Sequence, residues 1–306
     1  FFVSKERVPK TDHTPSFKET FVVLGKNRLL IIVIFAAILG STMVTANQCA
    51  DYIGNYIIIQ NYTNFTQIFQ DFLPGAQSTL VPNVDAAAAY DFWIPRGTIV
   101  TTLTVAIGVG MVPAMAIFPM LRKKFSLKQI YIGSALFGLI VHTLCYVVMA
   151  QDVTKANIYV LWVFLFLMGL PLGIYNVITY ALIADSVDYL EWKTGERQEG
   201  VCFAFQTFLS KVNAAVATFV FGQILDGTDF KAVDKSLVDN AGRQIFFQQS
   251  VDTQKMLLAL VTIVPAVGFL LTIIPMFFNN YTGKVKEQAQ KELEEKREKL
   301  MANSEN

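Results

Sequence analysis

Ionisable side chains are scarce in this chain of 306 residues. Asp, Glu, Lys and Arg make up 16% of it, against roughly 25% in a typical soluble domain. Histidine occurs twice, as His13 and His142, which leaves little for histidine-based catalysis. The sequence has no Walker A loop, no nucleophile elbow and no metal-spaced cluster of cysteine and histidine. We therefore expect neither an enzyme nor a cofactor, and the formal net charge of +1 gives no reason to expect a nucleic-acid partner.

Cysteine is also rare. Cys49, Cys145 and Cys202 all lie within apolar runs. We interpret them as small apolar packing residues and not as disulfide partners.

Apolar residues, in contrast, are abundant: they make up 53% of the chain, and its mean hydropathy is +0.44. Six stretches reach the length of about 20 residues that a helix needs to cross a bilayer. Lipid offers no partner for unpaired backbone groups, so we expect helices. The apolar runs are too continuous for the alternating strands of an outer-membrane barrel. The predicted fold class is an all-α membrane protein with spans at 29–59, 98–121, 129–150, 158–184, 201–225 and 256–278.

Lysine and arginine are distributed unevenly between the connecting segments. One side of the predicted membrane holds 18 of them and the other side holds 6. Because basic residues collect on the cytoplasmic side, both ends of the chain are predicted to be cytoplasmic. The start, Phe1-Phe2-Val3, is interpreted as the end of a preceding apolar helix. The predicted organisation begins with that helix end and a central cytoplasmic loop (1–28), followed by a six-helix bundle (29–279) with an outer insertion (60–97). The cytoplasmic tail (280–306) is expected to form a solvated helix, because Glu and Lys recur in it at i,i+4 spacing.

One charged residue lies inside a predicted span. Lys211 is near the middle of "FAFQTFLSKVNAAVATFVFG", where a lysine costs about 2.5 kcal/mol or more. We interpret it as lining a polar cavity, with a structural ion pair as the alternative. The other spans offer no carboxylate at its depth, so we expect its partner in a part of the protein outside this sequence. Lys211 shares a helical stripe with Thr207, Ser210, Ala214, Thr218 and Gly222, flanked by Gln206 and Asn213.

A second cluster of charges, "ADSVDYLEWKTGERQEG", lies between two spans, and its first three carboxylates recur every three residues. It is either an ordinary solvated loop or an ion-pair network that clasps the helix ends in one conformation and releases them in another. Partly solvated ion pairs are only modestly stabilising, so a network of this kind can break. The residues of this candidate gate are Asp185, Asp188, Glu191, Lys193, Arg197 and Glu199.

Glycine and proline interrupt two predicted spans. Gly169, Pro171 and Gly173 lie in one, and Gly108, Gly110, Pro113 and Pro119 lie in another. They predict either plain kinks for packing or the broken helices that flank a transporter's midplane site. His142 lies in a third span and is interpreted as a packing residue, since no partner for a proton relay is evident.

The residues from Ala184 onward resemble a known family. "ADSVDYLEWKTGERQEGVCFAFQTFLSKVNAAVATFVFGQIL" is similar to the "AD-x-VDY-x-E-x-K-x-x-x-R-x-E" loop and the following helix of the glycoside–pentoside–hexuronide:cation symporters, typified by bacterial melibiose permease. "SKERVPK…SFKETFVVLGKNRLL" resembles the central cytoplasmic loop of that family. The resemblance covers most of the chain and implies the major facilitator fold of two six-helix halves, with this chain as the C-terminal half.

By motif position, the resemblance implies that Lys211 faces the sugar and cation sites and that Gln206 and Thr207 form the polar pair before it. Two positions depart from the melibiose-type pattern. Asn176, beside Tyr175, stands where an aromatic sugar contact is expected, and Ser210 stands where an apolar residue is expected. The candidate substrate-binding residues are thus Lys211, Gln206, Thr207, Ser210, Asn176 and Tyr175, while the carboxylates of the cation site belong to the N-terminal half.

The function that follows from the resemblance is secondary active transport. We expect symport of a sugar or glycoside with Na⁺ or H⁺ by alternating access, in a bacterial inner membrane, with the bilayer and an N-terminal half as partners. Two alternatives stay open: a lysophospholipid carrier of the same fold, and a six-helix scaffold or half-size dimer without transport. The polar residues around Lys211 favour a sugar.

Overall fold

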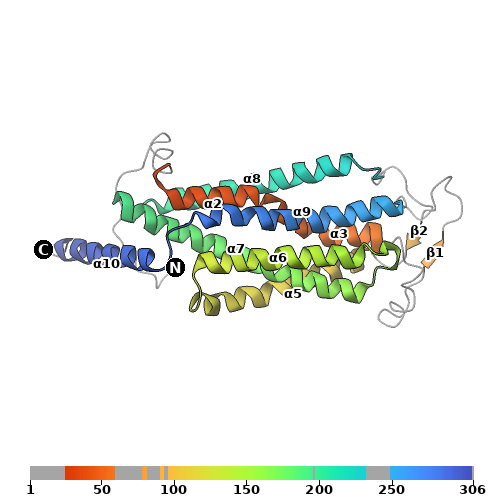
Figure 1. Cartoon of the computed structure of the whole chain (residues 1–306), viewed down its shortest axis with the longest axis horizontal. Coiled ribbons are helices and arrows are strands. Elements are labelled where there is room, and N and C mark those ends of the chain that lie inside the picture. The colour runs from red at the N-terminus through yellow and green to blue at the C-terminus, as the bar shows by residue number, and fades with distance from the viewer. Residues whose placement is uncertain are drawn as a thin grey trace.

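The long apolar stretches fold as helices that lie side by side along the long axis of the molecule (Figure 1). The computed structural model describes residues 25–58, 78–80, 90–92, 96–195, 197–231 and 249–304. Within these residues, five helices are long and apolar enough to cross a membrane. They correspond to the second to sixth predicted spans: α5 (Arg96–Arg122), α6 (Leu127–Met149), α7 (Ile158–Thr194), α8 (Glu199–Asp226) and α9 (Val251–Phe277).

The first predicted span is not one continuous α-helix. It consists of α2 (Arg28–Leu39), the 3₁₀-helix η1 (Ser41–Gln48), α3 (Cys49–Ile53) and the π-helix η2 (Gly54–Ile58). The change at Gly40 has a packing cause. The carbonyl of Ala36 accepts both the Gly40 N–H at 2.9 Å and the Thr272 hydroxyl of α9 at 2.7 Å. A β-carbon on Gly40 would lie 2.9 Å from the Thr272 side chain, so a glycine is needed for this approach.

The two spans that glycine and proline were expected to interrupt are, by contrast, continuous helices. Pro113 and Pro119 lie within α5, and Pro171 lies within α7. Of the two interpretations, packing is the one that the structure supports, because glycines mark the place where α5 and α7 cross. A β-carbon on Gly110 would lie 2.0 Å from the Phe166 carbonyl oxygen, and one on Gly169 would lie 2.2 Å from that of Ile107. Small residues allow helices in membranes to approach closely.

The exposed faces of α6 and α9 are apolar. Between residues 130 and 149, the exposed side chains of α6 are Leu136, Phe137, Ile140, Leu144, Val147 and Val148. Between residues 256 and 278, those of α9 are Met256, Val267, Leu270, Ile274, Phe277 and Phe278. Faces of this kind suit contact with lipid.

Two short strands belong to the predicted outer insertion. β1 (Ser78–Leu80) and β2 (Tyr90–Phe92) form an antiparallel pair in which Ser78 lies opposite Phe92. The sequence did not predict them. They lie at the opposite end of the molecule from α10 (Figure 1). The rest of residues 59–95 is outside the described part of the chain. With this pair as its β-structure, the described chain has the predicted all-α membrane architecture.

The C-terminal helix α10 (Lys284–Ser304) follows a short linker after α9 and projects beyond one end of the bundle, here called the α10 end (Figure 1). The tail was predicted to be solvated, and this is wrong for one of its faces. Ala289 is 0% exposed and Leu293 is 3% exposed, and Ala289 belongs to a small core with Leu29, Tyr281, Tyr189 and Trp192. The helix therefore docks against the end of α7.

Candidate functional site

Lys211 lies on an exposed polar face of α8. The helix packs through Leu209, Asn213, Ala217 and Phe221, which are buried. The opposite face carries Lys211 with Thr207, Ser210 and Thr218, all exposed, and the exposed rings of Phe208 and Phe219 border these polar residues. In the described part of the chain, Lys211 forms no salt bridge.

This face differs chemically from those of α6 and α9. α8 has 28 residues, and Lys211 is the thirteenth. Since an α-helix rises about 1.5 Å per residue, Lys211 lies well inside the span. An ammonium at that depth is costly against lipid and faces protein or water in membrane proteins. The face around Lys211 is therefore suited to a polar cavity or to another protein element, and not to hydrocarbon.

The hydroxyl oxygens of Thr207 and Ser210, near Lys211, are available to accept hydrogen bonds. Thr207 Oγ1 donates to the Phe203 carbonyl at 3.2 Å, and Ser210 Oγ donates to the Thr207 carbonyl at 2.7 Å. Each hydroxyl proton is thus engaged with the helix backbone, which leaves the oxygen lone pairs available to hydrogen-bond donors such as sugar hydroxyls. Gln206 is half-buried beside this face. Asn213, predicted to flank the stripe, is buried on the other side of the helix.

Asn176 and Tyr175 point in different directions from α7. Asn176 is exposed, as is Tyr180 one turn later. Tyr175 is turned inward, where its ring centroid lies 6.1 Å from that of Tyr131. It lines a small space of about 10 Å³ together with Phe269 and Thr272, which is about the room of a single water molecule. Of the two candidates, only Asn176 is on an exposed face.

The candidate gate residues of α7 form ion pairs at the α10 end. Arg197 lies in the turn between α7 and α8. Its guanidinium donates to Asp188 at 3.1 Å, to Glu191 at 3.0 Å and to Glu199 at 3.3 Å. Burial works against the charge of Arg197, but hydrogen bonds with Glu191 and Asp188 outweigh it and raise the pKa of the guanidinium.

Two basic residues of α10 complete this network, and neither was predicted from the sequence. Arg297 donates to Glu191 at 2.5 and 3.1 Å and to Asp188 at 3.4 Å. Lys286 pairs with Asp185. The hydrogen bonds with Glu191 raise the pKa of Arg297. A signal was present in the sequence, because Lys286 and Arg297 are eleven residues apart and therefore share one face of a helix.

Lys193, the remaining basic candidate, lies outside this network. Its Nζ is 3.9 Å from the centre of the Trp192 ring, and the residue is exposed. The lysine thus makes a cation–π contact and no salt bridge within the described residues. Arg122, at the end of α5, lies 3.8 Å from Asp185 and brings a third helix to the network.

A buried asparagine joins three helices at the same end. Asn27 is 0% exposed, and its Oδ1 caps α2 by accepting from Leu30 N at 3.1 Å. Its Nδ2 donates to the Ser186 carbonyl of α7 at 2.9 Å and contacts Cys202 Sγ of α8 at 3.9 Å. The role of Asn27 was not predicted from the sequence, although an asparagine before an apolar run is a typical N-cap signal.

His142, Cys145 and Cys202 occupy packing positions. His142 is buried, donates from Nδ1 to the Gly138 carbonyl at 2.8 Å and packs against Phe269. Cys145 and Cys202 are free and buried. Within the residues that the structure describes, no group of histidine, cysteine and carboxylates is arranged to hold a metal ion.

Comparison with known proteins identifies the family. Residues 89–283 match the family model described as MFS/sugar transport protein. The chain belongs to this family. It is accordingly an integral, multi-pass membrane protein from a family of transporters and not an enzyme.

Similar proteins include several bacterial carriers. A protein named as a sulfoquinovose importer in Salmonella typhimurium is 31% identical over 121 residues, which is 40% of this chain and 23% of that protein. The inner membrane symporter YicJ of Escherichia coli is 29% identical over 141 residues, 46% of this chain and 27% of YicJ. The raffinose carrier protein of Pediococcus pentosaceus is 26% identical over 155 residues, 49% of this chain and 22% of the carrier. The matches thus span about a quarter of each relative.

Proposed function

We propose that this chain forms one half of a secondary active transporter, which moves a sugar by alternating access and couples the movement to Na⁺ or H⁺. The observation that carries the proposal is Lys211, an unpaired cation within the described chain on an exposed polar face of a spanning helix. In a transporter family, a face of this kind suits the central cavity between two halves. Lys211 then pairs with carboxylates of the other half and releases them in turn as cation and sugar come and go.

The neighbouring side chains support a sugar as the substrate. Thr207 and Ser210 offer acceptor oxygens beside Lys211, and Gln206 and Asn176 offer amides that both donate and accept. We assign these residues to sugar hydroxyls. Raffinose and sulfoquinovose appear in the names of relatives, and a free ammonium also suits a sulfonated sugar. Both substrates therefore belong in any test.

The ion-pair network at the α10 end is assigned to the cytoplasmic gate, and the bias of basic residues supports this orientation. Asp185, Asp188 and Glu191 lie just beyond the apolar part of α7, whose 37 residues extend over about 55 Å, well past the roughly 30 Å hydrocarbon core. Arg197 and the two basic residues of α10 neutralise these carboxylates. We propose that the network holds the bacterial inner-membrane protein closed on its cytoplasmic side until substrate binds.

Lys211→Ala in the full-length protein tests the proposal. Vesicles with an imposed Na⁺ or H⁺ gradient are supplied with labelled raffinose or a sulfonated sugar, and accumulation is measured. We expect Lys211→Ala to lower the amount of sugar accumulated about tenfold or more. A tenfold ratio corresponds to a free-energy difference of about 1.4 kcal/mol. Lys231→Ala, which removes an exposed lysine beyond the end of α8, serves as the control. Normal gradient-driven accumulation by the Lys211 variant would overturn the assignment.

A further inference from the structure

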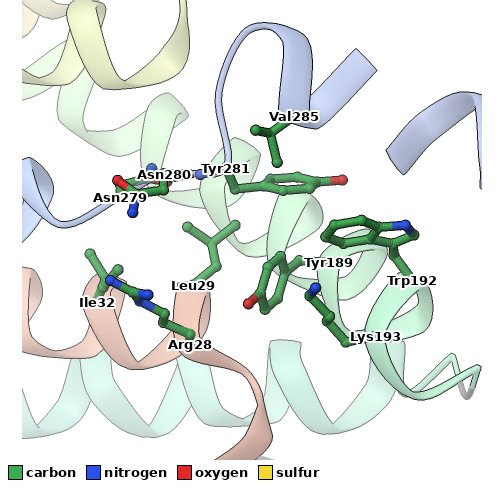
Figure 2. A pocket seen from close by; sticks show the side chains of 10 residues that line it. All are labelled: Arg28, Leu29, Ile32, Tyr189, Trp192, Lys193, Asn279, Asn280, Tyr281 and Val285. Carbon is green, nitrogen blue, oxygen red and sulfur yellow. Dashed lines mark hydrogen bonds between the residues drawn. The ribbon is translucent and has the colours of Figure 1, made fainter. Parts of the chain in front are cut away.

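A second pocket lies at the α10 end, apart from the face of Lys211. Figure 2 shows its walls, which come from the start of α2, the end of α7 and the linker between α9 and α10. Its volume is about 160 Å³. Pockets for drug-sized ligands have about 300–1,000 Å³, so this one has room for a small group and not for a whole sugar oligomer.

Two cations border this pocket. Arg28 and Lys193 are both exposed and line it, and none of the lining residues is acidic. Neither cation forms a salt bridge within the described part of the chain. This contrasts with Arg197 and Arg297 at the same end, which pair with carboxylates. Glu292 of α10, whose carboxylate accepts from Trp192 Nε1 at 2.6 Å, interacts electrostatically with Lys193. The pocket therefore has two cations without a salt bridge, and one of them, Arg28, has no carboxylate against it among the described residues.

The other walls are aromatic and amide groups. The rings of Tyr189 and Tyr281 meet edge to face, with their centroids 5.3 Å apart. The ring centroids of Trp192 and Tyr189 are 6.2 Å apart. Asn279 accepts the Tyr281 N–H at 3.0 Å through its Oδ1, which leaves its amide N–H groups as donors. In Figure 2 this nitrogen is turned toward the part of the pocket that α2 forms. A ligand there meets two cations, an amide donor and apolar rings.

The pocket also lies at the edge of the apolar surface. Phe277 and Phe278, which directly precede the linker, are each 61% exposed. Trp and Tyr collect at the boundary between hydrocarbon and lipid headgroups, and Tyr189, Trp192 and Tyr281 line the pocket. Basic pockets at this depth between spanning helices bind anionic headgroups. The position therefore matches the layer in which phospholipid phosphates lie.

We infer that this pocket binds the phosphate headgroup of an anionic phospholipid. Arg28 and Lys193 contact the phosphate, Asn279 donates to one of its oxygens, and the acyl chains lie outside along the apolar surface. The bound headgroup bridges α2, α7 and the linker, and so fastens the base of α10 to the bundle. The inference rests on the membrane position of the chain and is independent of the transported substrate.

Native mass spectrometry of the full-length protein in detergent tests this inference. The protein is mixed with phosphatidylglycerol or phosphatidylcholine, and the bound lipid is counted. We expect preferential retention of phosphatidylglycerol, and a loss of about tenfold or more in the variant Arg28→Gln/Lys193→Gln. The matched control is Lys123→Gln/Lys124→Gln, which removes two exposed cations from the turn between α5 and α6 at the same end.

Each possible result decides the inference. Loss of phosphatidylglycerol in the first variant with retention in the control supports it. Equal retention in both variants, or equal binding of phosphatidylcholine, overturns it. Displacement of phosphatidylglycerol by millimolar inorganic phosphate also overturns it, because the pocket would then be a site for free phosphate. The single variant Lys193→Gln replaces the double variant if the latter fails to fold. Because transport is not measured, failure here is distinct from failure of the proposed function.

Discussion

At the scale of single residues, Asn27 shows how one polar side chain can serve two purposes. Its oxygen caps α2, and its nitrogen donates to the Ser186 carbonyl of α7. The side chain is fully buried, so a lost hydrogen bond would leave a buried polar group without a partner, at about 1–3 kcal/mol. Asn27 is thus both a local helix signal and a link between elements that are more than 150 residues apart.

Asn27→Asp separates these two purposes. Aspartate is as good an N-cap as asparagine, but it removes the donor to Ser186 and buries a carboxylate. We expect a loss of about 1–3 kcal/mol, measured as a lower thermal unfolding midpoint in detergent. The control is Asn157→Asp at the exposed N-cap of α7, where we expect little change. If the two variants unfold at the same temperature, the link to Ser186 has no energetic importance.

At the scale of elements, the crossing of α5 and α7 depends on the absence of side chains. Gly110, Gly169 and Gly173 would each place a β-carbon within 2.5 Å of a backbone carbonyl oxygen of the opposite helix. Sequence alone could not distinguish these glycines from Gly108, which has open space around it. The difference arises from which helix lies opposite, and that is decided by tertiary packing.

The variants Gly110→Ala and Gly108→Ala test whether the crossing of α5 and α7 depends on missing side chains. The two positions lie two residues apart on the same helix. Gly110→Ala forces α5 and α7 apart, and overpacking of this kind costs about 1–3 kcal/mol. Gly108→Ala meets no neighbour and should be neutral or stabilise the helix by up to about 1 kcal/mol. Thermal unfolding in detergent distinguishes the two variants. A Gly110→Ala protein as stable as the wild type would show that the helices can separate without cost.

The first predicted span also has a feature that the sequence alone could not predict, and here the feature is the division of a whole element. Its length and apolar character predict one spanning helix, whereas the structure divides the segment into α2, η1, α3 and η2, and α2 is shorter than the five helices that are long enough to cross a membrane. The sequence does show a second half that is more polar than the first. The exact break at Gly40 depends on contact with Thr272, which is more than 230 residues away in the chain.

At the scale of the whole molecule, ion pairs hold α10 against the end of α7, although the helix projects beyond the bundle. The carboxylates of α7 outnumber the basic residues of their own segment, and Lys286 and Arg297 supply the remainder. Ala289 and Leu293 provide a small apolar contact on the same face. Few apolar residues are visible in the tail sequence, which explains why the tail was predicted to be solvated.

Arg297→Ala should release α10 from α7. Arg297 makes hydrogen bonds to both Asp188 and Glu191, and coupled neighbours of this kind contribute about 0.5–3 kcal/mol. We expect faster amide hydrogen exchange across residues 284–299, since local opening sets the exchange rate. Lys299→Ala, at an exposed position of the same helix, is the control. Unchanged exchange in the Arg297 variant would show that the apolar contact alone holds the helix.

The sequence by itself determined the class of this protein. The scarcity of charge, the six apolar stretches and the charged loop before Lys211 predicted an all-α membrane protein of a transporter family, because lipid imposes strong and local demands on composition. The tertiary structure decided which side chains meet. It turned Tyr175 inward and Asn176 outward, placed Lys193 over Trp192 and brought α10 to the carboxylates of α7. These outcomes depend on helix rotation and on partners distant in the chain, and neither follows from local residue pattern.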